Sequence, residues 1–222
     1  MGEEASAENV RVSPEALAGL GPMYPRFSNQ PVSNDNLEWL VDVTRMGSAE
    51  WNFQSRRWIV VRSETAKRRL EAASLLKIPL RNAPVILICL SDTLAWKSAP
   101  QRLQEMVASR KITEEEGREV LRQVQEYYSS SPEVAQRTAV ANGLVGVQQA
   151  LLGAAACGLS AYWITAFDEV KIKAHFHIPD QFTVAALVPI GYREEAPTPG
   201  PPLKPNAQQF VYHEKFGKVL DL

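Results

Sequence analysis

Residues 155–167 read Ala-Ala-Cys-Gly-Leu-Ser-Ala-Tyr-Trp-Ile-Thr-Ala-Phe, and this stretch decides the fold. It begins as the end of a helix of small residues, stops at Gly158, and continues as a short apolar strand through Ile164. Glycine commonly ends a helix because it adopts the left-handed conformation without steric cost. Small residues let a helix approach a large flat object, and the exit strand offers backbone N–H groups beside it. The stretch therefore predicts a ligand site rather than plain core.

The composition restricts the class of protein. The 222 residues carry a formal net charge of −1, so no global attraction to nucleic acid or anionic membrane is expected. The two cysteines, Cys89 and Cys157, lie far apart in apolar contexts, which favours reduced thiols and a cytoplasmic location. No apolar run reaches the roughly 18 residues that a membrane span needs. His175 and His177 lack partners at zinc-like spacing, so we expect a surface turn there and no metal site.

Apolar runs and capping residues predict the elements of secondary structure. The pattern favours a helix from Ser33 or Asn34 to Met46, a strand at 58–61, a helix at 63–74, a buried strand at 83–90, a long helix from Pro132 or Glu133 to Cys157, and a strand at 182–190. Residues 23–222 are expected to form one domain of the α+β class, in which helices flank a small mixed sheet in three layers. No Gly-x-Gly-x-x-Gly follows a strand, so a Rossmann site is not supported.

Three segments are not part of these predicted helices and strands. Residues 1–22 are expected to form an irregular or partly helical arm. Residues 96–130 are charged and helical, which predicts an excursion on the surface. Residues 197–222 start with a proline-rich crossing and end in an apolar stretch, so we expect a tail that wraps a neighbouring subunit.

Asn52 and Gln54 are the first candidate ligand-binding side chains. Each carries a donor and an acceptor, which suits the alternating edge of a pyrimidine-like ring. They lie between the end of a helix and the start of a strand. The alternative interpretation is that these amides only cap the loop.

The ordered set of motifs resembles the nitroreductase family of flavoproteins. That family has a Ser-x-x-Asn-x-Gln-Pro-Trp loop before an apolar strand; Asn52 and Gln54 match it, while Ser55 and Arg56 replace the Pro-Trp. The resemblance also covers the following segments: 82–86, 146–155, 158–164, 178–179, 188–192 and 212–217.

The resemblance implies an FMN enzyme built as an intertwined homodimer, with NAD(P)H as electron donor and a small-molecule acceptor. Backbone N–H groups of Thr165 and Ala166 would face flavin N5 and O4, with Asn52 and Gln54 at the ring. The family's arginine cluster for the FMN phosphate is reduced here to Arg26, with Lys204 near a tail position. Other cations, the pair 56–57 among them, are candidate substitutes; the alternative for that pair is solvated strand-edge arginines.

Aromatic residues of the excursion are candidates for capping the substrate. They are Trp96, Tyr127 and Tyr128, and the alternative is that they pack the excursion onto the body. The missing arginines leave two rival functions open. One is a scaffold or binding protein that keeps the fold and has weakened or lost flavin binding. The other is a specialised biosynthetic oxidase in which oxygen closes the flavin cycle.

Overall fold

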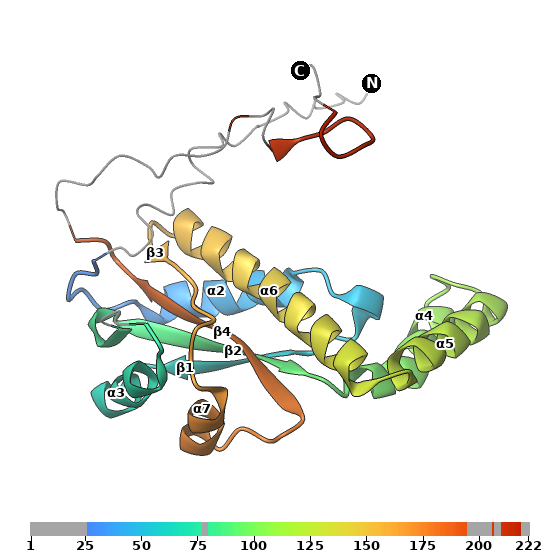
Figure 1. Ribbon diagram of the computed structural model, residues 1–222, viewed down its shortest axis with the longest axis horizontal. Coiled ribbons are helices and arrows are strands. Elements are labelled where there is room, and N and C mark those ends of the chain that lie inside the picture. Colours follow the sequence, from blue (N-terminus) through green and yellow to red (C-terminus); the bar gives the residue numbers. More distant parts are fainter. Residues whose placement is uncertain (1–25, 77–79, 195–205, 207–209, 219–222) are drawn as a thin grey trace, which may run out of the picture.

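The computed structural model describes residues 26–76, 80–194, 206 and 210–218. Its centre is a sheet in the order β1-β2-β4-β3 (Figure 1). The strands are β1 (Arg56–Val61), β2 (Val85–Asp92), β3 (Ser160–Ala161) and β4 (Phe182–Gly191). All pairings between these strands are antiparallel, so the expected mixed sheet is corrected for the part of the chain described. Because β2 and β3 both run antiparallel to β4, which lies between them, these two strands run in the same direction without pairing with each other.

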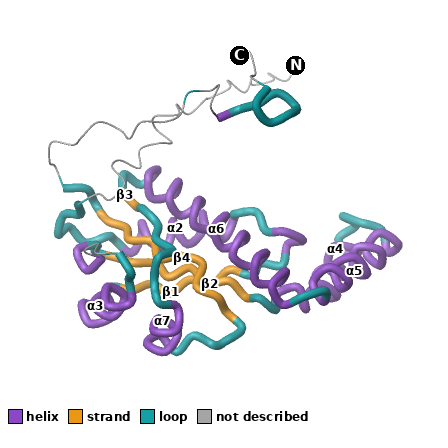
Figure 2. Tube along the Cα trace, viewed as in Figure 1, coloured by secondary structure: helices purple, strands orange, loops and turns teal. Residues whose placement is uncertain are grey.

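Helices cover both faces of the sheet, which gives the expected three layers. The helices are α2 (Asn34–Met46), α3 (Glu64–Ala73), α4 (Ala99–Ala108), α5 (Glu114–Ser129), α6 (Pro132–Ala156) and α7 (Glu169–Phe176). One face packs on α2 and α6, and the other on α3 and α7 (Figures 1 and 2). The strand β2 is buried on both sides because side chains alternate between the two apolar clusters.

Side-chain caps begin five of these six helices, and α4 is the exception. The side-chain oxygen of Ser33 accepts a hydrogen bond from the Asn36 N–H (3.1 Å) at the start of α2. Thr113 and Glu116 form a reciprocal capping box at the start of α5. Such caps satisfy backbone donors that have no partner inside the helix.

The small residues of α6 pack on the sheet itself. A Cβ atom added at Gly143 would lie 2.5 Å from the Ala185 Cβ on β4 and 2.9 Å from the Ser91 Oγ on β2. Gly153 faces α2 in the same way, with the nearest atom of Leu40 at 3.1 Å. The helix therefore approaches the sheet at Gly143 and α2 at Gly153, so at these positions the glycines serve the core and not a ligand.

The exit from α6 confirms part of the expected path. Gly158 adopts the left-handed conformation at φ 70°. The strand that follows is shorter than expected, since β3 holds two residues and Ile164 adds only a single bridge to Leu187. The chain then runs from the sheet to the end of α3, where Phe167 bridges Ser74.

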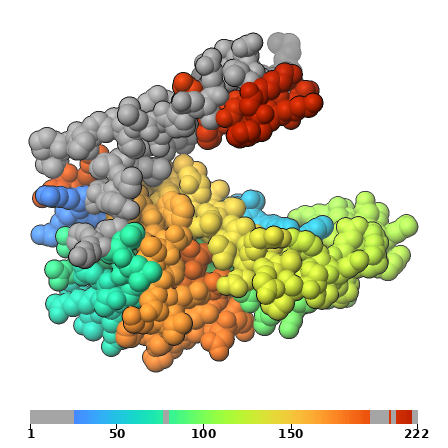
Figure 3. Space-filling view, in the orientation of Figure 1, coloured from blue at the N-terminus to red at the C-terminus, as the bar shows by residue number. Residues whose placement is uncertain are grey.

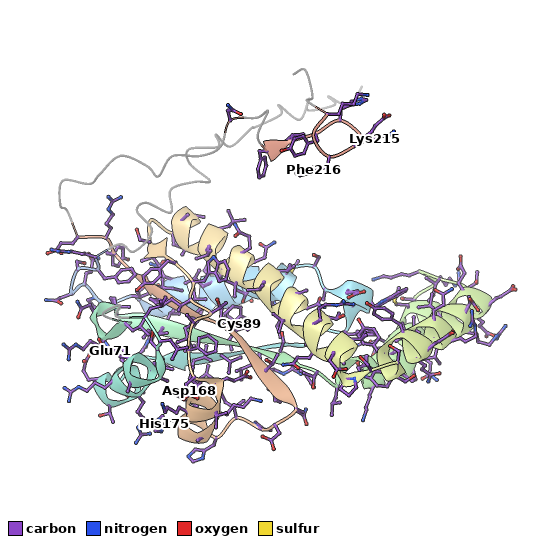
Figure 4. All side chains as sticks on the ribbon, in the orientation of Figure 1. Glu71, Cys89, Asp168, His175, Lys215 and Phe216 are labelled. Atoms are coloured by element: carbon purple, nitrogen blue, oxygen red, sulfur yellow. The ribbon has the colours of Figure 1, made fainter. Side chains whose placement is uncertain are left out.

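The helix α7 was not expected from the sequence. Asp168 caps it by accepting from the Lys171 N–H (3.1 Å), and Ile172 is its buried residue. His175 lies in the helix and His177 ends it in a left-handed conformation (Figure 4). The expected turn is thus a helix end, and the described residues contain no group of three or more His, Cys, Asp or Glu side chains placed to hold a metal.

The excursion 96–130 is helical, as expected, and projects from the body as the pair α4 and α5 (Figure 3). It joins the body through a third apolar cluster that includes Phe53, Leu103, Val124 and Tyr128.

Two further expectations concern the ends of the chain and membranes. The arm 1–22 lies outside the described residues, as does most of the tail. The described turn 210–218 exposes Phe216, 92% accessible, apart from the body (Figure 4). Among the described helices, α6 is long and apolar enough to cross a membrane by length and composition alone. It lies against the sheet with nine buried residues, which is the position of a core helix.

Candidate functional site

The loop 47–54 carries the two amide side chains predicted to read a ring edge. Trp51, Asn52 and Gln54 all have left-handed backbone conformations, with φ of 52°, 55° and 50°. Residues other than glycine are uncommon in this region, although asparagine enters it more readily than most, so Trp51 and Gln54 in particular place strain in the loop that surrounding contacts must maintain. Strain of this kind is often found at ligand sites.

The side chains of Asn52 and Gln54 are exposed and largely free to bind. The Gln54 Nε2 donates a long hydrogen bond to the Asn52 Oδ1 (3.4 Å). Among the described residues, the Asn52 Nδ2 donor and the Gln54 Oε1 acceptor have no partner. Together they present one donor and one acceptor, which is the pattern that a pyrimidine-like edge complements.

Arg56, at the start of β1, binds the first residues of this loop through its guanidinium. Its Nη1 donates to the Ser48 carbonyl (2.7 Å) and to the Asn142 carbonyl on α6 (3.3 Å). Its Nη2 donates to the Gly47 carbonyl. Burial lowers the pKa of this guanidinium, although an arginine side chain stays charged in proteins. Arg56 was expected to be either a phosphate ligand or a solvated arginine. In the structure its guanidinium donates to backbone carbonyls, so neither interpretation holds.

A second set of contacts holds the start of the same loop. The Glu50 N–H donates to the Asn142 Oδ1 (2.9 Å), and the Tyr128 hydroxyl donates to the Glu50 carboxylate (3.2 Å). Phe53 is buried in the cluster beneath α4 and α5. The loop is thus fixed to α5, to α6 and to the start of β1.

The segment Thr165–Ala166 carries the predicted backbone donors. The Ala166 carbonyl accepts from the Leu75 N–H (2.9 Å), and the Thr165 carbonyl accepts from the Phe167 N–H (3.2 Å). Neither the Thr165 nor the Ala166 N–H has an acceptor within the described residues. Thr165 is exposed and Ala166 is partly exposed, so both amides can meet a ligand.

These two groups of predicted site residues lie on opposite sides of the sheet. The loop 47–54 is bound to α6 and α5, on the side of α2 and α6. The segment 165–166 lies between Ile164 and Phe167, which pack into the cluster of α3 and α7. One chain therefore does not bring all the predicted donors to one ligand.

The predicted phosphate ligands are sparse. Arg26 is exposed, and its carbonyl accepts from the Glu194 N–H (2.9 Å). Lys204 lies outside the described residues. Arg57 is exposed, and its Nη1 donates to the carbonyls of Gln54 (2.9 Å) and Arg56 (2.7 Å). A hollow of about 360 Å³ next to the loop is lined by Thr44, Arg45, Gln54, Arg56, Arg57, Trp58 and the valines at 41 and 60.

The aromatic residues of the excursion divide between two roles. Tyr128 is 5% exposed, stacks on Trp96 at 6.0 Å and meets Phe53 edge to face at 5.9 Å. Tyr128 therefore packs the excursion on the body, which was the alternative interpretation, whereas Trp96 is only partly buried and stays a candidate for substrate contact. Tyr127 is 45% exposed and its hydroxyl accepts from Arg137 (3.2 Å), so it stays a candidate for substrate contact.

Sequence reasoning did not find the part that Arg56 and Asn142 play in shaping the loop. One signal was available: Arg56 replaces the tryptophan of the loop pattern, and a charged side chain at that position needs hydrogen-bond acceptors that a tryptophan does not. Asn142 stands one turn before Gly146 in a helix otherwise rich in small apolar residues.

A three-layer sandwich with a polar loop before its edge strand and a small-residue helix across one face defines a nitroreductase-type fold. A model of this family, described as "Nitroreductase family", matches residues 24–192. The chain therefore belongs to the nitroreductase family and is classed with its oxidoreductases.

Individual relatives are distant. The chain is 23% identical over 164 residues to a putative NAD(P)H nitroreductase, YodC, of Bacillus subtilis, covering 74% of this chain and 81% of that protein.

Solved structures share the fold at low identity. The putative nitroreductase ydfN of Bacillus subtilis superimposes with a TM-score of 0.79 at 20% identity, over 89% of this chain and 96% of that one. A putative nitroreductase in complex with FMN from Exiguobacterium sibiricum gives a TM-score of 0.72 at 16% identity, over 87% and 94% of the two chains.

Proposed function

We propose that the protein is an FMN-dependent oxidoreductase that works as a homodimer. Electrons would come from NAD(P)H and pass to a small organic acceptor such as a nitroaromatic or a quinone. Family membership, the NAD(P)H nitroreductase relative and the FMN-bound structural neighbour support this assignment. Both cysteines are free thiols, which suits a reducing, cytoplasmic location.

The observation that carries the proposal is a pair of backbone donors on the segment 165–166. These two neighbouring N–H groups have no acceptor among the residues that the structure describes, and such donors are suited to a ligand atom that gains electron density. Donors of this kind stabilise a reduced flavin and so raise its potential. Because they belong to the backbone, Thr165 and Ala166 can supply them as well as other residues could.

The residues present fit a flavin ring better than they fit its phosphate. Asn52 and Gln54 offer to the pyrimidine edge a donor and an acceptor that no described residue occupies. A phosphate dianion is best held by several charge-assisted donors. Only Arg26 of the described residues stands near the expected position, so we expect modest affinity unless Lys204 or other cations contribute.

The arrangement of these donors favours a dimer. Asn52 and Gln54 lie on the α6 side of the sheet, whereas Thr165 and Ala166 lie on the α3 and α7 side. A single ring contacted by both groups would need two copies of the chain. Exposed apolar side chains on α2 and α6 also favour association; they are Trp39 at 44%, Val41 at 47%, Met46 at 79% and Val145 at 40% exposure. The tail would then wrap the partner, with Phe210 and Phe216 as its exposed apolar contacts.

Bound FMN supplies two-electron transfer between a nicotinamide and an acceptor. The chain's own contribution is to bind and orient the ring through the donors named above. The described residues around both segments include no side chain that must act as acid or base, since solvent and acceptor can supply protons. Tyr127 is exposed and its ring meets that of the loop anchor Tyr128 edge to face at 5.2 Å, so it is proposed to contact the acceptor.

Anaerobic mixing tests the proposed electron donor. The FMN-loaded protein is mixed with NADH or NADPH in the absence of oxygen, and the absorbance of the oxidised flavin is followed. Rapid bleaching by either nicotinamide is expected. Failure of both, together with bleaching by a chemical reductant, would contradict the donor and favour the biosynthetic oxidase.

A further inference from the structure

The loop 47–54 is strained at three positions, and something must hold it. Trp51, Asn52 and Gln54 all have positive φ, although none of them is glycine. Within the loop, the Asn52 N–H donates to the Ala49 carbonyl (3.0 Å) and the Phe53 N–H to the Glu50 carbonyl (3.2 Å). Two turn bonds of this kind do not by themselves maintain three left-handed residues.

Arg56 adds a constraint at the start of the loop, beside the bonds of Asn142 to the Glu50 N–H (2.9 Å) and of Arg57 to the Gln54 carbonyl (2.9 Å). Its guanidinium donates to the carbonyls of Gly47 and Ser48 at the start of the loop and of Asn142 on α6. A planar fork with several donors can fix more than one carbonyl at once, and a lysine cannot do so with the same geometry. The bonds involve a charged donor, which makes them stronger than those between neutral groups.

The helix α6 is shaped to admit this side chain. A Cβ atom at Gly146 would lie 2.5 Å from the Arg56 Cδ, so the arginine passes directly over the glycine. Asn142, one turn earlier, accepts from Arg56 through its carbonyl and from the Glu50 N–H through its side chain. The pairing of Arg56 with Gly146 and Asn142 ties the loop to the sheet and to α6 together.

We propose that Arg56 is the positioning residue of the loop 47–54: seated over Gly146 and bound to three backbone carbonyls, it holds Asn52 and Gln54 in the conformation that reads the flavin ring. The residue stands where the family pattern has tryptophan, so this chain replaces a bulky apolar wedge by a hydrogen-bonded clamp. Arg56 acts through the loop and does not touch the ring itself. The proposal rests on the proposed FMN function for its ligand, but not for the ordering of the loop.

Two substitutions of Arg56 distinguish the effect of its hydrogen bonds from the effect of its charge. Arg56→Met removes all donors and keeps an unbranched side chain over Gly146. Arg56→Lys keeps the charge and loses the fork. Arg62→Met is the matched control, because Arg62 follows the same strand, is exposed, and bonds to Asn34 (2.9 Å) far from the loop.

Three quantities are measured on each full-length variant. They are the dissociation constant for FMN from fluorescence quenching, the midpoint potential of the bound flavin, and amide hydrogen exchange of residues 47–54 with and without FMN. We expect Arg56→Met to weaken FMN binding at least about tenfold, Arg56→Lys to weaken it less, and Arg62→Met to stay within about twofold. In Arg56→Met, amide exchange in the loop should be faster and the midpoint potential of the flavin should change. A loss of global stability alone would not change that potential.

The outcomes distinguish this inference from the proposed function. If the unmodified chain binds FMN, and Arg56→Met binds it equally with the same potential and a protected loop, the inference is wrong. If the unmodified chain binds no FMN, the proposed function fails, and exchange in the loop still decides whether Arg56 orders it. Should Arg56→Met not fold, Gly146→Ala displaces the arginine without removing it and is expected to weaken FMN binding in the same direction as Arg56→Lys.

Discussion

Replacing Gly143 by alanine tests how closely α6 lies on the sheet. The new Cβ would be 2.5 Å from the Ala185 Cβ and 2.9 Å from the Ser91 Oγ. Ordinary contacts between carbon atoms are about 3.5–4.0 Å, so the helix and β4 must separate by about 1 Å. The Ala185 Cβ is fixed by the backbone of β4 and has no rotamer through which to give way.

The expected loss of stability follows from two opposing terms. Overpacking costs about 1–3 kcal/mol, and this substitution falls in the upper part of that range, about 2–3 kcal/mol, because the Ala185 Cβ cannot give way. Alanine returns about 1 kcal/mol through its higher helix propensity. We therefore expect a net loss of about 1–2 kcal/mol, which in a chain of this size lowers the melting temperature by about 2–8 °C. The assay is urea and thermal unfolding of the cofactor-free protein at fixed concentration, followed by circular dichroism.

Gly153→Ala in the same helix is the matched control. Its new Cβ would meet the ends of side chains, Leu40 at 3.1 Å, Val43 at 3.3 Å and Trp39 at 3.4 Å, which can move by a few tenths of an ångström. We expect a change within about 1 kcal/mol of the unmodified protein. The reasoning fails if Gly143→Ala is as stable as the unmodified chain, or if Gly153→Ala is the more damaging of the two.

Two further predictions concern buried titratable groups. The Lys67 ammonium is buried and donates to two backbone carbonyls, at 3.0 Å each, besides its ion pair with Glu64. Lys67→Met should lower the free energy of unfolding by about 2–4 kcal/mol because it leaves those carbonyls unpaired, whereas Glu64→Gln, at an exposed carboxylate, should change it much less; equal effects in urea titrations would contradict this. Burial raises the pKa of Cys89 from 9.0 to about 12, so its contribution to stability is complete below pH 9 and declines as the pH rises toward 12. Unfolding measured at pH 8 and pH 10.5 should show this decline in the unmodified chain and a smaller one in Cys89→Ala, and identical pH profiles would show that Cys89 is not its source.

Much of the fold could be predicted because its signals are local. The unbroken apolar run at 83–90 indicated the central strand β2, and Ser33 indicated the start of α2. The helix α7 was missed because only Ile172 of its eight residues is buried, which leaves almost no apolar periodicity. Asp168, which caps the start of this helix, is the sequence signal from which it could have been predicted.

The site was harder to predict because its shape depends on contacts distant in sequence. The amides of Asn52 and Gln54 could be selected by type, but their left-handed backbone depends on Arg56 and on Asn142, about 90 residues further along the chain. Tyr128 was selected as an aromatic residue, and only the packing of three rings shows that it is buried. Sequence patterns indicate which groups are available, whereas the sheet determines which of them meet.

The absorbance spectrum of the protein purified after FMN supplementation tests the central claim most directly. Released cofactor should be identified by chromatography and the mass of the particle determined by light scattering. The account predicts a yellow homodimer with one FMN per chain, which would mean that other residues replace the missing arginines of the phosphate site. A colourless protein that cannot be loaded with FMN would contradict the account and leave a scaffold of nitroreductase fold as the better explanation.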